Sequence, residues 1–181
     1  TGNDAVKEST EAGTSDNAGS TDGYELALVI DVGTIDDKSF NQGSWEGVQK
    51  YGDENGIAYK YYKSAEATTD SFQETIELAI EGGAKVIVCP GYLFEEPIYN
   101  MQTAHPDVKF ILIDGEPHDA DKNYETADNT MAVLYQEDQA GFLAGYAAVK
   151  DGYTKLGFMG GMALPAVIRY GYGYLAGADY A

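Results

Sequence analysis

Between residues 25 and 113, short apolar runs alternate with longer segments in which apolar residues recur at helical spacing. The short runs, mostly β-branched or aromatic, predict strands at 25–30, 58–62, 86–89 and 109–113. The longer segments predict helices at 40–54, 69–81 and 94–103. Because regular alternation of strand and helix implies right-handed crossovers, we expect a parallel, doubly wound α/β sheet.

The pattern changes after residue 114. Residues 115–129 are polar and aperiodic, and they outnumber the ~4–6 residues of a typical connection, which predicts a hinge-region loop. Beyond this loop the pattern predicts strands at 130–135 and 155–158 and helices at 139–150 and 166–176. We therefore expect an N-terminal lobe over 24–129. Residues 130–181 would begin a second lobe and stop in mid-domain, because one new strand and two helices cannot bury a sheet on both faces.

Composition limits the classes of partner. The 181 residues carry 30 acidic side chains against 11 Lys and Arg, a formal net charge of −19. Such a field repels nucleic acid and anionic membrane surfaces, so we expect neither as a partner. A single cysteine, Cys89, excludes an intramolecular disulfide. No run reaches the ~20 apolar residues of a membrane span, and no signal peptide is visible.

Residues 1–23 differ from the rest of the chain in composition. Thr, Ser, Gly, Ala, Asn and Asp dominate, and the first aromatic residue is Tyr24. This composition predicts an acidic, disordered segment. Two interpretations stay open for it, a flexible tether or an ordinary ragged terminus.

Three of the predicted strands are followed by residues suited to a ligand site: Asp31, Gly91 and Asp114. The carboxyl ends of parallel strands share one edge of the sheet, and ligands of open α/β sheets bind at that edge. Ser39 and Gln42 fit a capping box, which would begin a helix at Phe40 beside Asp31.

Two motifs resemble those of a known family. The first is Asp31-Val-Gly with Ile35-Asp-Asp-Lys-Ser-Phe-Asn-Gln42; the second is Leu156-Gly-Phe-Met-Gly-Gly-Met162, followed by Pro165, Val167, Arg169 and the Gly and Tyr run of 170–177. In this order they closely resemble the basic membrane protein family, the purine-nucleoside receptor (PnrA-like) lipoproteins that serve ABC importers. The resemblance covers residues 24–181, and two ordered motifs are more specific than a lone glycine pattern.

The resemblance implies a type I periplasmic-binding-protein fold with flavodoxin-like strand order, and an apparently truncated second lobe. It implies a substrate-binding protein that captures a purine nucleoside between two lobes and presents it to a membrane ABC permease. It also implies an extracytoplasmic protein, anchored to the outer face of the cell membrane by a lipid upstream of Thr1. We expect no enzyme activity, no cofactor and no metal.

The strand-end positions and the resemblance together give seven candidate ligand contacts: Asp31, Phe40, Asn41, Gly91, Asp114, Gly160 and Gly161. Phe40 would stack on the base, the two carboxylates would accept hydrogen bonds from the nucleoside, and the glycines would let it approach the backbone. Five of the seven, all except Gly160 and Gly161, have a plainer alternative. The ring packs on the sheet, each Asp closes a loop, Asn41 caps the helix, and Gly91 makes a tight turn.

Other functions fit the sequence less well. The loop after the first strand lacks G-x-G-x-x-G, so a dinucleotide enzyme is disfavoured. His105 and His118 have no partners at metal-ligand spacing, and Cys89 closes an apolar run as a buried thiol would. Three alternatives stay open: a sugar or autoinducer receptor of the same fold, the effector-sensing domain of a regulator, and a flavodoxin-like enzyme.

Overall fold

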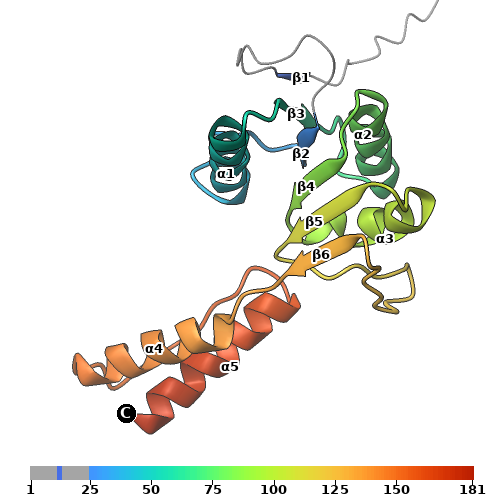
Figure 1. Ribbon diagram of the computed structural model, residues 1–181. Helices are drawn as coiled ribbons and strands as arrows, with labels where there is room; N and C mark the ends of the chain where they lie inside the picture. Colours follow the sequence, from blue (N-terminus) through green and yellow to red (C-terminus); the bar gives the residue numbers. More distant parts are fainter. Residues whose placement is uncertain (1–11, 14–24) are drawn as a thin grey trace, which may run out of the picture. The chain divides into compact units, whose positions relative to one another are not determined.

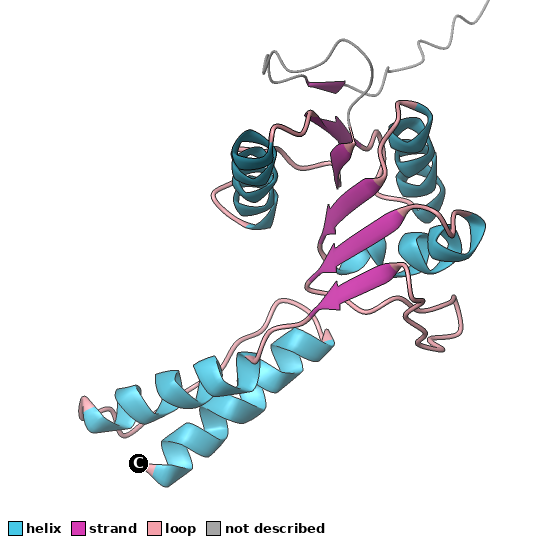
Figure 2. Ribbon diagram, viewed as in Figure 1, coloured by secondary structure: helices cyan, strands magenta, loops and turns pink. Residues whose placement is uncertain are grey.

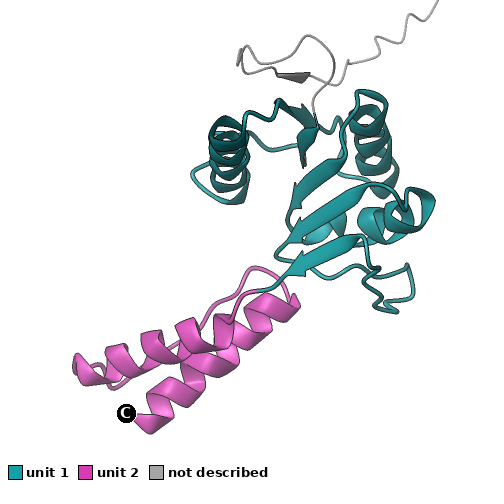
Figure 3. Cartoon of the chain, in the orientation of Figure 1, with its two compact units in different colours: residues 1–134 teal, residues 135–181 magenta. Residues whose placement is uncertain are grey.

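The computed structural model describes residues 12–13 and 25–181. These residues form two compact units, one ending at residue 134 and the other beginning at residue 135 (Figure 3). The predicted disordered tether, residues 1–23, lies outside the described residues except for Ala12–Gly13, the strand β1.

A six-stranded sheet forms the first unit, in the order β1-β3-β2-β4-β5-β6 (Figure 1). Five of its strands are parallel: β2 (Leu26–Ile30), β3 (Tyr59–Lys63), β4 (Val86–Pro90), β5 (Lys109–Ile113) and β6 (Thr130–Val133). β1 pairs antiparallel with β3. When the five parallel strands are numbered 1 to 5 along the chain, their order across the sheet is 2-1-3-4-5. This order confirms the predicted doubly wound sheet with flavodoxin-like strand order.

Helices pack on both faces of this sheet, but unequally (Figure 2). One face is covered by α2 (Thr69–Glu81), the short η1 (Tyr92–Phe94) and α3 (Glu95–Ala104). On the other face, α1 (Phe40–Asn55) contributes Trp45 and Val48 to a separate core cluster. Trp45 meets the rings of Tyr59 and Tyr61 of β3 edge to face, with centroids 5.5 and 5.2 Å away, and the same cluster includes Leu28 of β2 and Val88 of β4.

The boundary after the first sheet differs from the expected one. We expected residue 130 to begin the second lobe, whereas β6 pairs with β5 in parallel, from Phe110↔Thr130 to Ile113↔Val133. The first compact unit consequently runs to Leu134 instead of ending at residue 129. The sequence of a short strand does not show which strand it pairs with, because tertiary packing determines the pairing.

The polar stretch 115–129 is anchored to α3. Asn129 is buried, and its Nδ2 donates to the carbonyl oxygens of Gln102, His105 and Val108 at 3.0 to 3.1 Å. The Gln102 side chain in turn accepts from the Ala127 amide at 3.1 Å. These bonds fix the segment that leads into β6.

The second unit is a helical hairpin of α4 (Glu137–Lys150) and α5 (Pro165–Tyr180). Its helices approach closely through glycines: a Cβ at Gly145 or Gly177 would lie 2.0 or 1.9 Å from a carbonyl oxygen of the facing helix. Arg169, a residue of the second motif, forms a bidentate pair with Glu137 at 2.8 and 3.2 Å.

The strand predicted at 155–158 is wrong. Residues 153–163 have no regular secondary structure and are exposed. A strand needs a neighbour to bond its amides and carbonyls, and no strand lies within the second unit as described.

Among the described residues, no helix combines the length and the apolar character that crossing a membrane requires.

Candidate ligand-binding site

The register of the sheet places the ends of the parallel strands along one edge. Ile30 pairs with Lys63, Pro90 with Ile113, and Ile113 with Val133. The residues that follow these ends are Asp31, Ser64, Gly91, Asp114 and Leu134. Three predicted site residues, Asp31, Gly91 and Asp114, are therefore brought to the same edge.

Asp31 is held by its own loop and by α1. Its Oδ1 accepts hydrogen bonds from the Gly33 amide at 2.9 Å and from Asn41 Nδ2 at 3.1 Å. Because a carboxylate here can only accept, the amide nitrogen of Asn41 must face it. Within the described part of the chain no hydrogen bond reaches Asp31 Oδ2, so this oxygen can accept one from a ligand.

Asn41 is 6% exposed, and its side chain is occupied in holding Asp31. Its backbone amide bonds to Asp37 Oδ2 at 3.3 Å. Asn41 thus joins the first turn of α1 to the end of β2. This geometry suits a residue that orients the Asp31 carboxylate.

The predicted capping box is wrong in one part. Ser39 occupies the N-cap position, but its side chain makes no capping hydrogen bond. Asp37 takes that role: Oδ1 accepts from the amides of Ser39 at 2.7 Å and Gln42 at 3.1 Å. Gln42 does fold back, and its Oε1 accepts from the Lys38 amide at 3.0 Å. A carboxylate near a helix N-terminus is favoured over a hydroxyl, since it also meets the positive end of the helix dipole.

The electrostatics of Asp37 follow from these bonds. Desolvation by itself would raise the pKa of the Asp37 carboxyl, but the amides of Gln42, Ser39 and Asn41 outweigh it. The pKa accordingly lies below its ordinary value of 3.8, and Asp37 stays ionised as the anchor of the helix start.

Phe40 is the first residue of α1 and is 43% exposed. The ring is not enclosed in either hydrophobic core cluster. Its neighbour Asn41 contacts Asp31, so the backbone of Phe40 is fixed beside the carboxyl edge of the sheet.

Gly91 and Asp114 are linked across β4 and β5. The Gly91 amide donates to the Ile113 carbonyl at 2.7 Å, next to Asp114. Gly91 has φ of 104°, which side chains disfavour, and a Cβ there would meet nothing within 4 Å. Asp114 has φ of 61°, and its amide donates to Val133 at 2.8 Å. Asp tolerates this conformation better than most residues, so both residues turn the chain away from the sheet edge.

Gly160 and Gly161 belong to the second unit, in the exposed segment before α5. A Cβ on Gly160 would lie 2.5 Å from Val167 Cγ1, which gives this glycine a local packing reason. A Cβ on Gly161 would meet nothing within 4 Å.

Three residues of the edge were not singled out from the sequence. Asp37 accepts from the amides at the start of α1, and its place three residues before the first helical residue is a capping signal. Ser64 is 1% exposed, and its Oγ donates to the Ile30 carbonyl at 3.0 Å, tying β3 to the end of β2. Glu95 accepts from the Glu116 amide at 3.1 Å, which fixes the turn after Asp114; no sequence pattern marks this contact.

The remaining reactive side chains are placed as follows. Cys89 is fully buried in β4, and burial raises the pKa of its thiol. His105 Nε2 lies 2.8 Å from Glu77 Oε1. His118 is buried, and its Nδ1 lies 2.7 Å from the Asp119 carbonyl oxygen. No cluster of three or more His, Cys, Asp or Glu suited to a metal ion occurs among the described residues.

The sheet order is that of an α/β protein of the type I periplasmic-binding-protein class, and a solved structure agrees. A solute-binding protein of an ABC transporter system from Aeropyrum pernix K1 superposes with a TM-score of 0.69 at 25% identity, over 87% of this chain and 43% of that one.

The chain belongs to the family described as ABC transporter substrate-binding protein PnrA-like, whose profile matches residues 24–181. The ABC transporter nucleoside-binding protein BmpA of Lactococcus lactis is 30% identical, over 85% of this chain and 43% of that protein. Basic membrane protein A1 of Borrelia garinii is 33% identical, over 87% of this chain and 44% of its own length. The chain thus spans less than half the length of these relatives. Family and fold class are confirmed.

Proposed function

We propose that this chain is part of the extracytoplasmic substrate-binding component of an ABC importer, and that the component binds a purine nucleoside. Family membership supports the importer, and the nucleoside-binding relative from Lactococcus lactis supports the ligand class. The observation that carries the proposal is the half-exposed ring of Phe40, whose neighbour Asn41 holds the Asp31 carboxylate at the end of β2.

Each residue has a distinct role. The Phe40 ring stacks on the base, and a base on an aromatic face is worth roughly 1–3 kcal/mol. Asp31 Oδ2 accepts a hydrogen bond from the base or the ribose, oriented by Asn41, and Asp114 accepts a second. Gly91 lets the nucleoside approach the backbone between them.

The second lobe closes over this edge. Gly160 and Gly161 contribute backbone of that second lobe in the family-length protein, and its two lobes exchange open and closed states. The ligand shifts the population toward the closed state because it gains contacts there. The membrane permease binds the closed state, and a lipid upstream of Thr1 keeps the protein at the outer face of the membrane. The function is binding and delivery without covalent chemistry.

The test is calorimetry on the family-length chain, meaning the complete reading frame that contains these 181 residues. Inosine, adenosine and guanosine are titrated beside bare bases, ribose and glucose. We expect nucleosides to bind, and Phe40→Ala to weaken every base-containing ligand by about 5- to 150-fold.

Two control variants separate stacking from general damage. Phe40→Trp keeps an aromatic face and should retain affinity. Tyr153→Ala removes a ring that is 60% exposed in the loop after α4, and should leave binding unchanged. Tight glucose binding without nucleoside binding, or equal affinities of Phe40→Ala and the parent, would show that the proposal is wrong.

A further inference from the structure

A buried histidine is connected to the turn that carries Asp114. Nε2 of His118 lies 3.2 Å from Oε2 of Glu95, the first residue of α3, and the two side chains are only 5% and 17% exposed. The other oxygen of this carboxylate, Oε1, accepts a hydrogen bond from the Glu116 amide at 3.1 Å. Glu95 therefore joins the start of α3 and the turn 114–116 to a titratable side chain that the proposed binding mechanism does not use.

The turn at Asp114 depends on contacts on both of its sides. Asp114 has φ of 61°, and a residue other than glycine stays in this left-handed region only when neighbouring contacts hold it there. On one side, the Asp114 amide donates to the Val133 carbonyl at 2.8 Å. On the other side, Glu95 holds the Glu116 amide. Loss of the Glu95 contact should therefore loosen the backbone from which the Asp114 carboxylate extends.

Gly115 gives the Glu95 side chain the space to reach this turn. A Cβ on Gly115 would lie 3.0 Å from Glu95 Cγ, 3.2 Å from Glu95 Oε1 and 3.3 Å from Leu112 Cδ2. Contacts this short are tighter than nine in ten real Cβ contacts, so a side chain at this position would displace the carboxylate or the turn. The contact between Glu95 and the turn is thus built into the sequence at both ends.

Two partners compete for His118 Nε2. The Asp119 carbonyl oxygen lies 2.7 Å from Nδ1 and can only accept, so Nδ1 carries a hydrogen in both charge states of the ring. Nε2 lies 2.8 Å from Lys122 Nζ as well as 3.2 Å from Glu95 Oε2. An ammonium only donates and a carboxylate only accepts. The neutral ring therefore accepts from Lys122, whereas the protonated ring donates to Glu95.

Two further titratable groups lie beside His118 in the described chain. The Asp119 carboxylate is occupied by hydrogen bonds from the loop that follows it. The ring of Tyr124 meets the imidazole edge to face, with centroids 5.2 Å apart. Neither contact uses Nε2, so Glu95 and Lys122 are the charged groups between which the protonation of His118 decides.

We propose that Glu95 is a positioning residue for Asp114 in ligand binding, and that His118 sets how firmly Glu95 holds the turn. This inference rests on the proposed function, in which Asp114 is a ligand residue. With His118 protonated, both oxygens of Glu95 accept hydrogen bonds and the turn 114–116 is fixed. With His118 neutral, Lys122 bonds to Nε2 and the Oε2 contact is lost. Nucleosides should therefore bind more tightly at the acidic end of the range in which histidine changes charge, about pH 5–8.

The first test measures the affinity of the family-length chain for inosine, adenosine and guanosine by calorimetry at two pH values. We expect binding to be at least about fivefold tighter near pH 5.5 than near pH 8, the lower end of the coupling between linked sites. His118→Gln keeps a hydrogen-bond donor but cannot be protonated in this range, so the difference should disappear. His105→Gln is the matched control, because His105 pairs with Glu77 at the other end of α3, and the difference should remain.

Substitutions of Glu95 separate its two contacts. Glu95→Gln keeps an oxygen that accepts from the Glu116 amide, so it should bind nucleosides as the parent does near pH 8 and lose the pH dependence. Glu95→Ala removes both contacts and should weaken binding about tenfold or more at both pH values. Glu77→Gln, in the His105 pair, should bind as the parent does. The urea midpoint of Trp45 fluorescence shows whether each variant is folded; if Glu95→Ala is not, Glu95→Gln and His118→Gln decide the test.

The outcomes separate this inference from the proposed function. If no nucleoside binds to the parent at either pH, the proposed function is wrong and this inference is wrong as well. If the parent binds and folded Glu95→Ala binds equally tightly, only the inference is overturned. The inference is also overturned if the parent has the same affinity at both pH values, or if its pH dependence persists in His118→Gln.

Discussion

The glycine contact between α4 and α5 gives a sharp prediction for Gly177→Ala. A Cβ at Gly177 would lie 1.9 Å from the Phe142 carbonyl oxygen and 2.7 Å from its carbon, where real Cβ atoms almost never come within 3.0 Å. The obstacle is backbone, so no side-chain rotation relieves it. The helices must separate by about 1 Å, the difference between 1.9 and 3.0 Å, along a contact that Gly145 shares.

The magnitude follows from overpacking. Extra methyl groups forced into a packed contact cost about 1–3 kcal/mol. Alanine returns up to about 1 kcal/mol of helix propensity, which offsets part of that cost. We expect a net loss of about 1–2 kcal/mol, a shift of about 1 M in the urea midpoint of the hairpin. Gly47→Ala, the same change in α1 with open space around it, should be neutral or stabilising.

Urea titration with two signals assigns the effect to a unit. Trp45, a residue of α1, is the sole tryptophan and packs in the core between α1 and the sheet, so its fluorescence reports unfolding of the first unit. Far-UV circular dichroism also reports the α4–α5 hairpin. Gly177→Ala should move the dichroism transition to lower urea and leave the fluorescence transition in place. A dichroism midpoint equal to or above that of the parent would refute the close approach of the helices.

Two further predictions concern caps and pH. Asn129→Ala removes the hydrogen bonds that its side chain donates to three carbonyl oxygens and should cost about 1–3 kcal/mol, measured by the midpoint of Trp45 fluorescence. Asn123→Ala, which changes an exposed asparagine of the same loop, is the control. The pKa of Asp37 lies below its ordinary value of 3.8, because hydrogen bonds from backbone amides outweigh desolvation. The pKa of Glu137 lies below its ordinary value of 4.5, because Arg169 donates hydrogen bonds to its carboxylate. The stability that these two ionised carboxylates contribute is fully present above the ordinary pKa values and is lost as the pH falls through the lower pKa values of the folded state. The thermal unfolding midpoint should therefore decrease when the pH is lowered below about 4. Asp37→Ala should flatten this fall and lower stability at neutral pH by about 0.5–2 kcal/mol; an unchanged profile would contradict the cap.

Much of the first sheet could be predicted from the sequence. Its strands alternate with helices, and each apolar run ends in a residue that breaks the strand, such as Asp31 or Asp114. The register then follows from the fold class, which is why the strand-end residues were predicted to share an edge.

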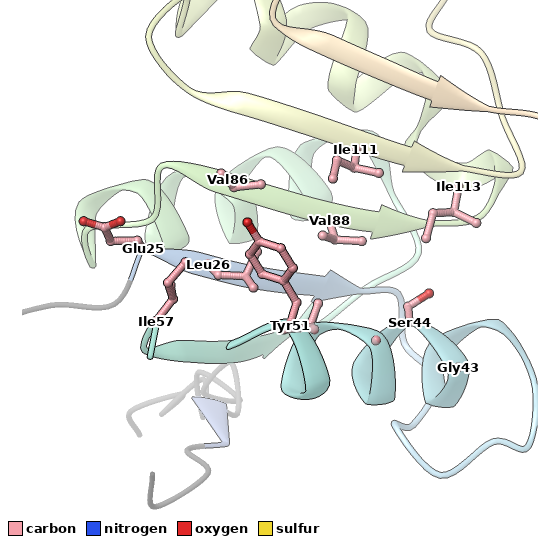
Figure 4. A pocket seen from close by; sticks show the side chains of 12 residues that line it. Glu25, Leu26, Gly43, Ser44, Tyr51, Ile57, Val86, Val88, Ile111 and Ile113 are labelled. Atoms are coloured by element: carbon pink, nitrogen blue, oxygen red, sulfur yellow. The ribbon is translucent and has the colours of Figure 1, made fainter. Parts of the chain in front are cut away.

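Other features depend on contacts that no local pattern carries. The run 155–158 looks like a strand, but β structure requires a partner, and none lies in its unit. Ser39 and Asp37 are both good caps, and the carboxylate is preferred because it satisfies several amides at once. The groove beside α1, which is lined by Val86, Val88, Ile111 and Ile113 (Figure 4), was not predicted, because an apolar strand has the same sequence pattern whether one face or both faces are covered.

The shortness of β6 has a consequence for handling the protein. β6 ends the sheet, carries the 62% exposed side chain of Met131, and would be a natural place for a foreign strand to add. It has only four residues, and the loop before it is fastened to α3 through Asn129. Few unpaired backbone groups are thus offered to a neighbouring molecule. A substitution that removes the Asn129 contacts should free this loop and expose a longer strand edge at β6, and self-association of the protein should increase.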